Sequence, residues 1–368
     1  MSNNIIIIGA GLSGLYLARQ LEQTLPSDSR LLILEARERT GGRILSPQWG
    51  ESTESRVDLG PAWLWPQFQP RLNSLMNDLH CRSFKQFTGG DMLYETVDGT
   101  LQQYGGPSSH DQSCRVVAGT IELINALQQQ LQRSEIHLHT EVNSIDLHNG
   151  KITATCTADN TEKTVSYDAD KIILALPLRL LAQNIQLTPP VDAALLAQWN
   201  NTATWMASHC KIVFIYKQAF WREQQRSGEV FSHYGPMTEI YDASPDNESF
   251  HALSAFIGLN AQQRKQIGRK ALISACQAQL QRLFGDDATQ PLQILTEDWS
   301  ENPYTASELD LNTPVQHPHY SEDAPRVLAN GRVYLAGTET AIEHGGYLEG
   351  ALESADYIVD LLHQQNAG

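Results

Sequence analysis

Positive charge is scarce in this sequence. Its 368 residues hold 26 Lys and Arg against 42 Asp and Glu, which gives a formal net charge of −16. Proteins that bind nucleic acids without sequence preference need clustered Lys and Arg to neutralise the phosphates. The charge balance therefore excludes that class, and we expect no nucleic-acid partner. A net charge of this size favours solubility.

Cysteine is also rare, and its positions exclude the usual uses of clustered thiols. The residues are Cys81, Cys114, Cys156, Cys210 and Cys276. Their number is odd, their spacing is wide and no C-x-x-C pair occurs, so we expect neither a disulfide framework nor a zinc site. Unpaired thiols fit a reducing compartment. The sequence therefore predicts a cytoplasmic protein without a bound metal.

Long apolar runs are missing as well. No stretch approaches the roughly 20 apolar residues that cross a bilayer, so we expect no membrane association. The first apolar stretch, Ile5–Ile8, leads directly into a glycine motif. It lacks the basic leader and the small-residue cleavage site of a signal peptide, so we interpret it as part of the folded protein.

The composition is that of a folded protein, with 41% apolar and 18% charged residues. A chain of this length is expected to form two domains. Its beginning predicts a buried strand over Asn4–Ile8, a helix over Leu12–Leu25 and a second buried strand over Leu31–Glu35. Such a βαβ unit implies a parallel sheet.

Further elements follow along the chain. Apolar spacing predicts helices over Thr120–Leu131, Ala261–Phe284 and Tyr347–Leu362. Strands are expected over Ile136–Leu147, Lys151–Thr157, Thr164–Tyr167, Lys171–Leu176 and Arg332–Ala336, with Asn149-Gly150 as a hairpin turn. Both ends of the chain have the pattern of a nucleotide-binding domain and the region between them does not. This predicts an interleaved architecture.

A G-x-G-x-x-G motif occupies residues 9–14, between the first strand and the first helix. In that context Gly9 permits the tight turn, Gly11 lets backbone approach a pyrophosphate, and Gly14 lets the helix pack on the strand. Ser13 lies in the first turn of the helix, whose N-terminus favours anions. Glu35 ends the second strand, where an acidic residue binds ribose hydroxyls. The motif predicts a dinucleotide site and does not distinguish NAD from FAD.

The next segment does distinguish them. Residues 35–43 read E-A-R-E-R-T-G-G-R, which resembles a motif of the flavin-containing amine oxidases, the monoamine and polyamine oxidase family. Gly42, with the glycine before it, would bring the chain against the diphosphate. Arg43 would neutralise it with a forked guanidinium, and Arg37 belongs to the same basic run.

The resemblance continues along most of the chain. Matching segments are Asp58–Trp63 beside the flavin, Gly119-Thr120 at a helix start, Val142 at the adenine, Ala175–Pro177 and Leu187–Pro190 at the entry to the substrate domain, Gly337–Thr340, and Gly345–Ala351. The cofactor-binding residues that motifs and resemblance imply are Gly9, Gly11, Ser13, Gly14, Glu35, Arg37, Gly42, Arg43, Gly60, Ala62, Val142, Trp299, Gly337, Glu339, Gly346, Tyr347 and Leu348.

Three residues are implied in catalysis. Lys211 lies in an apolar strand and matches the family's lysine that holds a water at flavin N5; strand alternation puts Val213 and Ile215 on its face. Trp299 matches the tryptophan packed beside the isoalloxazine. Tyr347 matches one wall of the aromatic cage that guides an amine to the flavin. The helix beginning near Gly346 would aim its positive end at the flavin.

Three departures from the family pattern modify these expectations. Glu308 stands where a covalent flavin cysteine would be, so we expect noncovalent FAD. Leu309 stands where monoamine oxidases have the second cage tyrosine, which puts a simple monoamine preference in doubt. The stretch from Tyr94 to Gly119 is too short for the family's helical lid and reads as a loop. We therefore expect a wide opening, bulky amines as better substrates than benzylamine, or a partner chain over the site.

The resemblance implies an α/β fold in which a Rossmann-like FAD-binding domain is interleaved with an α+β substrate domain, the amine oxidase fold, with a shortened helical lid region. We expect residues 1–70, 115–178 and 325–368 in the FAD-binding domain, and residues 71–114 and 179–324 in the substrate domain.

The implied activity is FAD-dependent oxidation of an amine C–N bond to an imine, with the flavin reoxidised by dioxygen or another acceptor. Two alternatives stay open: a desaturase- or protoporphyrinogen-type oxidoreductase of the same fold, and an FAD-binding maturation or partner protein. Lys211 and Tyr347 favour amines. We interpret His317-Pro318-His319 as a solvated loop, because no third metal ligand is in sight.

Overall fold

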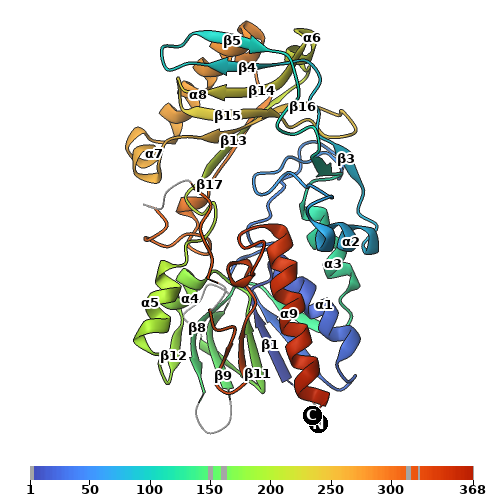
Figure 1. Ribbon diagram of the computed structural model, residues 1–368, viewed down its shortest axis with the longest axis vertical. Coiled ribbons are helices and arrows are strands. Elements are labelled where there is room, and N and C mark those ends of the chain that lie inside the picture. The colour runs from blue at the N-terminus through green and yellow to red at the C-terminus, as the bar shows by residue number, and fades with distance from the viewer. Residues whose placement is uncertain (1–3, 148–151, 159–163, 312–315, 322–323, 368) are drawn as a thin grey trace.

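The computed structural model describes residues 4–147, 152–158, 164–311, 316–321 and 324–367. Three sheets with their covering helices form the two ends of the elongated molecule: the six- and four-stranded sheets lie at one end and the seven-stranded sheet at the other (Figure 1). One end contains β1 (Asn4–Ile8) and α9 (Leu348–Ala367), which are the first and last elements of the chain. The interleaved architecture that the sequence predicts is therefore present.

The first sheet is parallel except at one edge. Its order is β18 (Val327–Leu328), β19 (Val333–Leu335), β11 (Lys171–Leu174), β1, β2 (Arg30–Leu34) and β7 (Ser134–His137). β1 pairs in parallel with β2 and β11, so both backbone edges of the first strand are bonded. The sheet thus joins segments from almost the whole chain, as the resemblance implies.

Both faces of β1 are buried, which explains its unbroken run of isoleucines. Ile5 and Ile7 pack in a core with α1 (Leu12–Thr24), α3 (Ile121–Gln130) and α9. Ile6 and Ile8 pack in a second core with residues of a smaller sheet. A strand covered on both faces gains nothing from alternation, so a continuous apolar run is the expected sequence.

The smaller sheet corrects one sequence expectation. Its order is β10 (Thr164–Ala169), β9 (Ile152–Ala158), β8 (Thr140–Asp146) and β12 (Gln186–Thr188). The predicted strand Ile136–Leu147 is two strands, β7 in the first sheet and β8 here, because His139 between them has a positive φ of 50° that turns the chain. The predicted turn at Asn149-Gly150 lies outside the described residues.

The third sheet forms the other end of the molecule. Its order is β17 (Gln293–Asp298), β13 (Cys210–Tyr216), β16 (His251–Ile257), β15 (Met237–Asp242), β14 (Arg226–Ser232), β4 (Asp91–Glu95) and β5 (Leu101–Tyr104). Helix α8 (Arg269–Phe284) covers one face. The predicted helix Ala261–Phe284 is in fact α7 (Ala261–Ile267) and α8, because Gly268 has φ +77° and ends the first.

The remaining elements are short. They are α2 (Pro70–Asp78), α4 (Leu178–Asn184), α5 (Ala193–Asn201), α6 (Phe220–Glu223), the paired strands β3 (Ser83–Lys85) and β6 (Cys114–Val116), and 3₁₀ turns at Asp286–Thr289, Trp299–Glu301 and Thr338–Thr340. The stretch between β4 and β6 contains the strand β5 and otherwise loops, so the helical lid region is shortened as expected.

The predicted domain boundaries stay a prediction. Helix α2 follows residue 70 and was assigned to the substrate domain, yet its Leu72 and Leu75 pack in the core of α1 and α9. The boundary predicted between residues 178 and 179 likewise separates Leu178 from Trp199, although both side chains pack in one core. Within the described residues, no helix is long and apolar enough to cross a membrane.

Candidate functional site

The glycine turn between β1 and α1 forms one wall of a cavity of about 400 Å³. Gly9 has a φ of +106°, and a Cβ there would lie 2.5 Å from the carbonyl oxygen of Ala175. Gly14 does not line the cavity: its Cβ would lie 2.0 Å from the carbonyl oxygen of Gly9, so glycine lets α1 pack on β1. Gly11 faces open space, with no atom within 4 Å of where its Cβ would be.

The second pair of glycines lies directly against the first turn. The Gly41 N–H donates to the carbonyl oxygen of Ala10 at 2.8 Å, and a Cβ on Gly42 would lie 3.4 Å from the Cα of Gly11. Gly41 and Gly42 have φ values of +95° and +56°, where side chains are strained. Two glycine segments 30 residues apart therefore present bare backbone to one cavity.

Glu35 holds this turn together. Its side chain is buried, one carboxylate oxygen accepts the Ala10 N–H at 2.8 Å and the other accepts the Arg37 N–H at 2.9 Å. The Oε1 atom also lies 3.6 Å from an Arg37 Nη, which leaves the Oε2 atom with a second lone pair for a hydroxyl group. Glu35 lines the cavity, so a role toward ribose stays a prediction that this geometry permits.

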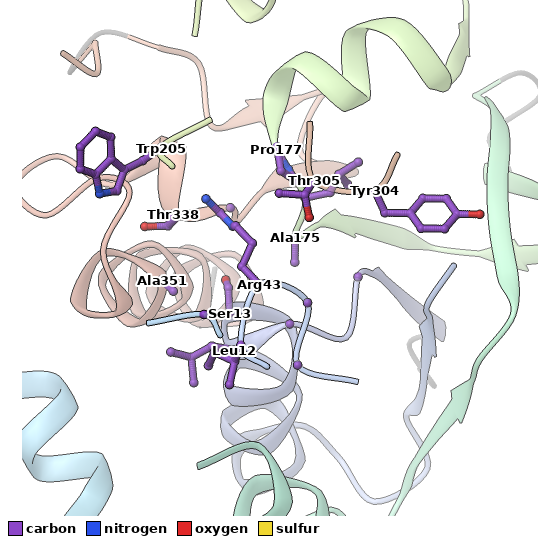
Figure 2. A pocket seen from close by; sticks show the side chains of 18 of the residues that line it. Leu12, Ser13, Arg43, Ala175, Pro177, Trp205, Tyr304, Thr305, Thr338 and Ala351 are labelled. Carbon is purple, nitrogen blue, oxygen red and sulfur yellow. The ribbon is translucent and has the colours of Figure 1, made fainter. Parts of the chain in front are cut away.

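Arg43 and Glu339 meet across the cavity wall. One Arg43 Nη lies 2.7 Å from a carboxylate oxygen of Glu339, whose side chain is fully buried. Figure 2 shows Arg43 extending from the turn past Ser13 toward Thr338. The hydroxyl group of Ser13 donates to the carbonyl oxygen of Ala336. The pair brings the N-terminal and C-terminal motifs to one place, where both were predicted to contact the cofactor.

Arg37 is bound to residues that the sequence did not point to. Its guanidinium donates to Asn302 Oδ1 at 3.0 Å and to Thr305 Oγ1 at 2.7 Å, and burial lowers its pKa. The guanidinium also lies 5.5 Å from the ring centre of Tyr304. Tyr304 and Thr305 line the cavity beside Val142 (Figure 2 labels the first two). No sequence motif marks Tyr304 and Thr305, because what connects them to the site is their contact with Arg37, which is far away in the sequence.

The turn with Gly60 and Ala62 is anchored from behind by Asp58. Asp58 Oδ1 accepts hydrogen bonds from the Ser46 hydroxyl at 2.6 Å and from the Thr120 N–H at 2.9 Å, which ties the turn to the start of α3. A Cβ on Gly60 would lie 2.3 Å from the carbonyl oxygen of Arg43. Both Gly60 and Ala62 line the cavity.

Lys211 lies on β13 with its ammonium in the cavity. Val213 and Ile215 pack on the same face of the strand, as alternation predicts. The Nζ atom donates to the carbonyl oxygen of Gly60 at 3.0 Å and lies 5.4 Å from the ring centres of both Trp63 and Phe256.

Burial changes the acidity of this lysine. Loss of hydration lowers the pKa of Lys211 to about 8, against the opposing effect of Asp58 and with a further lowering from Arg115. A lysine with this pKa exists in both protonation states near neutral pH. Such perturbed groups in cavities are characteristic of functional sites.

Trp299 is fixed beside the turn that contains Leu59 and Gly60. Its indole N–H donates to the carbonyl oxygen of Leu59 at 3.0 Å, and the side chain is buried except where it lines the cavity. Its backbone N–H donates to the carbonyl oxygen of His209 at 3.0 Å. Trp299 therefore connects the turn at Leu59 and Gly60 with the start of β13.

Tyr347 lines the cavity directly before the start of α9. Helix α9 begins at Leu348, after Gly346 with φ +83° and Tyr347. The Tyr347 ring is 44% exposed and stacks on His317, with centroids 4.9 Å apart and planes at 10°. His317 is exposed in a loop, as interpreted, and one face of its ring stacks on Tyr347.

Three more aromatic side chains complete this side. The ring of Trp205 lies 4.9 Å from His317 and 5.8 Å from His209, which in turn lies 6.3 Å from Phe256. Trp205, His209 and Phe256 all line the cavity. Burial and the nearby charge of Arg264 lower the pKa of His209 to about 4, so this imidazole is neutral. No motif marked these residues; they come together through strand pairing and loop packing.

The positions expected to correspond to the covalent cysteine and to the second cage tyrosine lie outside the cavity lining. Glu308 and Leu309 are exposed on a turn, and Leu309 is 45% exposed. Among the described residues, no group of three or more His, Cys, Asp or Glu has the arrangement of a metal site.

The predicted residues are thus gathered at one cavity. All of them except Gly14 line it: Gly9, Gly11, Ser13, Glu35, Arg37, Gly42, Arg43, Gly60, Ala62, Val142, Lys211, Trp299, Gly337, Glu339, Gly346, Tyr347 and Leu348. Their binding and catalytic roles stay predictions.

The same segments carry a recognisable family pattern. A model of the flavin-containing amine oxidoreductases matches residues 107–362, and a model of NAD(P)-binding Rossmann-like domains matches residues 7–79. The chain belongs to the flavin-containing amine oxidoreductase family. The family implies a flavin cofactor, and the residues present fit one: two bare glycine backbones, a helix N-terminus and Arg43 face the cavity together.

Curated relatives of this family member are distant. A probable flavin-containing monoamine oxidase A from Dictyostelium discoideum is 28% identical over 261 residues, covering 70% of this chain and 54% of the relative. A putative flavin-containing monoamine oxidase AofH from Mycobacterium tuberculosis is 26% identical over 286 residues, covering 75% and 56%. The chain spans about half the length of the curated relatives it matches.

Solved structures resemble the entire fold. A putrescine oxidase variant with redesigned cofactor binding superposes with a TM-score of 0.80 at 18% identity, covering 99% of both chains. Cyclohexylamine oxidase from Brevibacterium oxydans superposes with a TM-score of 0.80 at 17% identity, covering all of both chains. At these identities the likeness establishes the fold, an α/β flavin domain combined with an amine oxidase substrate domain.

Proposed function

We propose that this protein binds FAD noncovalently and uses it to oxidise the C–N bond of an amine to an imine. The observation that carries the proposal is the convergence on one cavity of the glycine turn, the Arg43–Glu339 pair, Trp299, Lys211 and Tyr347. These residues come from distant parts of the chain. An apolar cavity with a few convergent polar groups and a lysine of perturbed pKa has the character of an active site.

The bound flavin would supply the two-electron oxidation; the protein positions and tunes it. Gly11 and Gly42 leave room for the diphosphate, and Arg43 offsets its charge. Trp299 is held by its bond to Leu59 and would support the ring system. The gathering of these groups in a recess limits water around them.

Lys211 and Tyr347 are proposed to act on the substrate side. Lys211 is fixed by the Gly60 carbonyl group and can hold or move a proton at Nζ, since its pKa lies near 8. Tyr347 offers an aromatic surface that attracts an approaching ammonium group. The imine would then leave the site and hydrolyse in water. Dioxygen or another acceptor would take up the electrons.

The cofactor claim is tested first. The purified protein should be yellow, and acid precipitation should release FAD into the supernatant, because none of the described residues that line the cavity is a cysteine. Colour that remains in the precipitate would contradict noncovalent binding. A colourless protein that cannot be reconstituted with FAD would contradict the entire proposal.

The reaction is tested by anaerobic mixing with an amine panel while the flavin absorbance is followed. Bleaching by amines supports amine oxidation. Comparing benzylamine with bulkier amines tests the proposal that the shortened lid region favours large substrates. Bleaching by a C–C substrate alone would instead favour a desaturase-type reaction.

A further inference from the structure

A buried ion pair lies behind the turn that holds Lys211. Arg115 belongs to β6, which follows the shortened lid region, and its side chain is 5% exposed. One of its Nη atoms lies 3.8 Å from Oδ2 of Asp58, whose side chain is 1% exposed. Gly60, two residues after Asp58, provides the carbonyl group that accepts the hydrogen bond of Lys211. One short turn therefore brings two buried cations close to a single carboxylate.

The guanidinium group of Arg115 is held in place independently of this turn. Its Nη1 atom donates to the carbonyl oxygen of Ser244 at 2.9 Å, and its central carbon lies 5.4 Å from the ring centre of Phe84 on β3. Asp58 Oδ2 has no hydrogen-bond partner among the described residues. The carboxylate is therefore close enough to Arg115 for charge compensation but keeps an oxygen that forms no hydrogen bond.

A second buried ion pair lies near the first and compensates itself. Arg222 lies 2.8 Å from Asp242, and both act on Arg115 with opposite sign. Removing Arg115 therefore leaves Asp58 without a guanidinium group, because Arg222 is already paired.

The strands beside Lys211 add little to its electrostatic surroundings. The residue opposite Lys211 is Phe256 in β16 and Glu297 in β17. Three arginines attract the carboxylate of Glu297: Arg39, Arg37 and Arg269. On β13 itself, burial lowers the pKa of His209 to about 4, so this ring is neutral. Asp58 and Arg115 are therefore the charged groups that act on Lys211 most strongly.

One carboxylate can compensate only one of two buried cations. A guanidinium group does not lose its proton in proteins, whereas a buried lysine does so readily. Arg115 therefore stays charged beside Asp58, and the surplus positive charge is relieved at Lys211. In agreement, burial and Arg115 lower the pKa of Lys211 to about 8, against the opposing effect of Asp58.

We propose that Arg115 is a positioning residue that compensates the charge of Asp58 and so leaves Lys211 free to release its proton at the cavity. Without Arg115, the carboxylate of Asp58 would stabilise the ammonium form of Lys211. The effect on turnover rests on the proposed amine oxidation, in which Lys211 holds or moves a proton. The effect on the charge of Lys211 can be measured without any substrate.

The direct test is a carbon NMR titration of protein isotopically labelled at lysine Cε, whose chemical shift follows the charge of the amino group. The Lys211 signal is identified by its absence in Lys211→Met. In the wild type we expect its midpoint near pH 8. In Arg115→Gln the midpoint should rise by about one pH unit or more, and in Asp58→Asn it should fall by about as much. Arg82→Gln, at an exposed arginine, is the control and should leave it unchanged.

A double variant guards against loss of folding, because removing one partner of a buried ion pair is strongly destabilising. Asp58→Asn combined with Arg115→Gln leaves neither charge unpaired. Its midpoint should lie above that of Asp58→Asn and below that of Arg115→Gln, so either single variant completes the comparison. All variants are measured in sucrose, which stabilises folded states, and circular dichroism verifies their folding.

The pH dependence of flavin reduction separates this role from a structural one. The rate is measured anaerobically with one amine, so that the ionisation of the substrate is the same for every variant. Arg115→Gln should be about tenfold slower than the wild type at pH 7 and approach the wild-type rate at pH 10, as a rise of about one pH unit requires. A merely structural defect would lower the rate equally at every pH.

The outcomes distinguish this inference from the proposed function. An unchanged Lys211 midpoint in folded Arg115→Gln, or equal midpoints in Asp58→Asn and the double variant, would overturn the role of Arg115. If the midpoints move as expected but no amine reduces the wild-type flavin, the proposed function fails and the electrostatic role of Arg115 stands.

Discussion

The two halves of the cavity hold their side chains by different physical means. In the glycine-turn half (residues 9–14, 35–43 and 337–339), polar groups are fixed by backbone hydrogen bonds and the Arg43–Glu339 ion pair. In the aromatic half (Trp63, Trp205, His209, Phe256, His317 and Tyr347), rings contact one another, with Lys211 among them. The first half contains positions, such as Gly9 and Gly14, where an added Cβ would overlap a backbone oxygen, whereas the side chains of the second half can repack.

The largest expected effect tests whether the rigidity of the glycine-turn half serves the fold or the cofactor. Gly14→Ala places a Cβ 2.0 Å from the carbonyl oxygen of Gly9. We expect a loss of about 3 kcal/mol or more in the free energy of unfolding, because backbone must move. Chemical denaturation measures it.

Gly11→Ala is the matched variant. No atom lies within 4 Å of its Cβ position and its φ of −77° suits alanine, so the fold should be unaffected. We expect FAD to bind about 10- to 100-fold more weakly, because the methyl group occupies the space of the diphosphate. Equal stability loss in both variants, or unchanged FAD affinity in Gly11→Ala, would contradict this separation of roles.

The second prediction concerns the one buried ammonium of the aromatic half. Lys211→Met should keep FAD bound and slow flavin reduction by on the order of a hundredfold, as removal of a positioned polar group at a reaction centre does. Stopped-flow absorbance under anaerobic conditions measures it. Wild-type rates in both half-reactions would show that Lys211 has no chemical role.

The same variant has a pH signature in stability. The unfolded lysine titrates near 10.5 and the folded one near 8, so between these pH values the unfolded state binds more protons and stability rises with pH. The stability that this lysine contributes is complete above its unfolded pKa and is lost as pH falls through 8. It amounts to at most about 3 kcal/mol. As the pH rises from 7 to 10, the unfolding free energy of the wild type should therefore increase relative to that of Lys211→Met.

The smallest effect tests how readily the aromatic half repacks. His317→Ala removes the ring stacked on Tyr347, a contact worth about 1 kcal/mol, and should raise KM for amines about three- to tenfold with kcat little changed. His319→Ala, at an exposed histidine in the same segment, is the control, and His317→Phe should restore KM. A fall in kcat with constant KM would contradict a role in substrate approach.

The same contrast explains what the sequence could predict. Gly9, Gly41 and Gly42 need φ values that only glycine adopts easily, so the glycine-turn half leaves a local motif. Phe256 faces Lys211 only because β13 and β16 pair in that register, and His317 meets Tyr347 from 30 residues away. Such contacts depend on tertiary packing and leave no local pattern, which is why Trp205, His209 and Phe256 were missed.

Errors in the elements have a similar origin. The strand expected over Ile136–Leu147 and the helix expected over Ala261–Phe284 each continued through a single residue with positive φ, His139 and Gly268. Apolar periodicity runs across both positions, so only the backbone conformation separates the elements.

The burial of β1 on both faces has a consequence for synthesis of the chain. Its four isoleucines are translated about 340 residues before α9, which covers Ile5 and Ile7. At the usual elongation rates roughly 20 to 70 s separate the two events. During that time the nascent chain carries this apolar strand without the cover of α9, so a chaperone that binds short aliphatic segments should associate with the strand until α9 has been made.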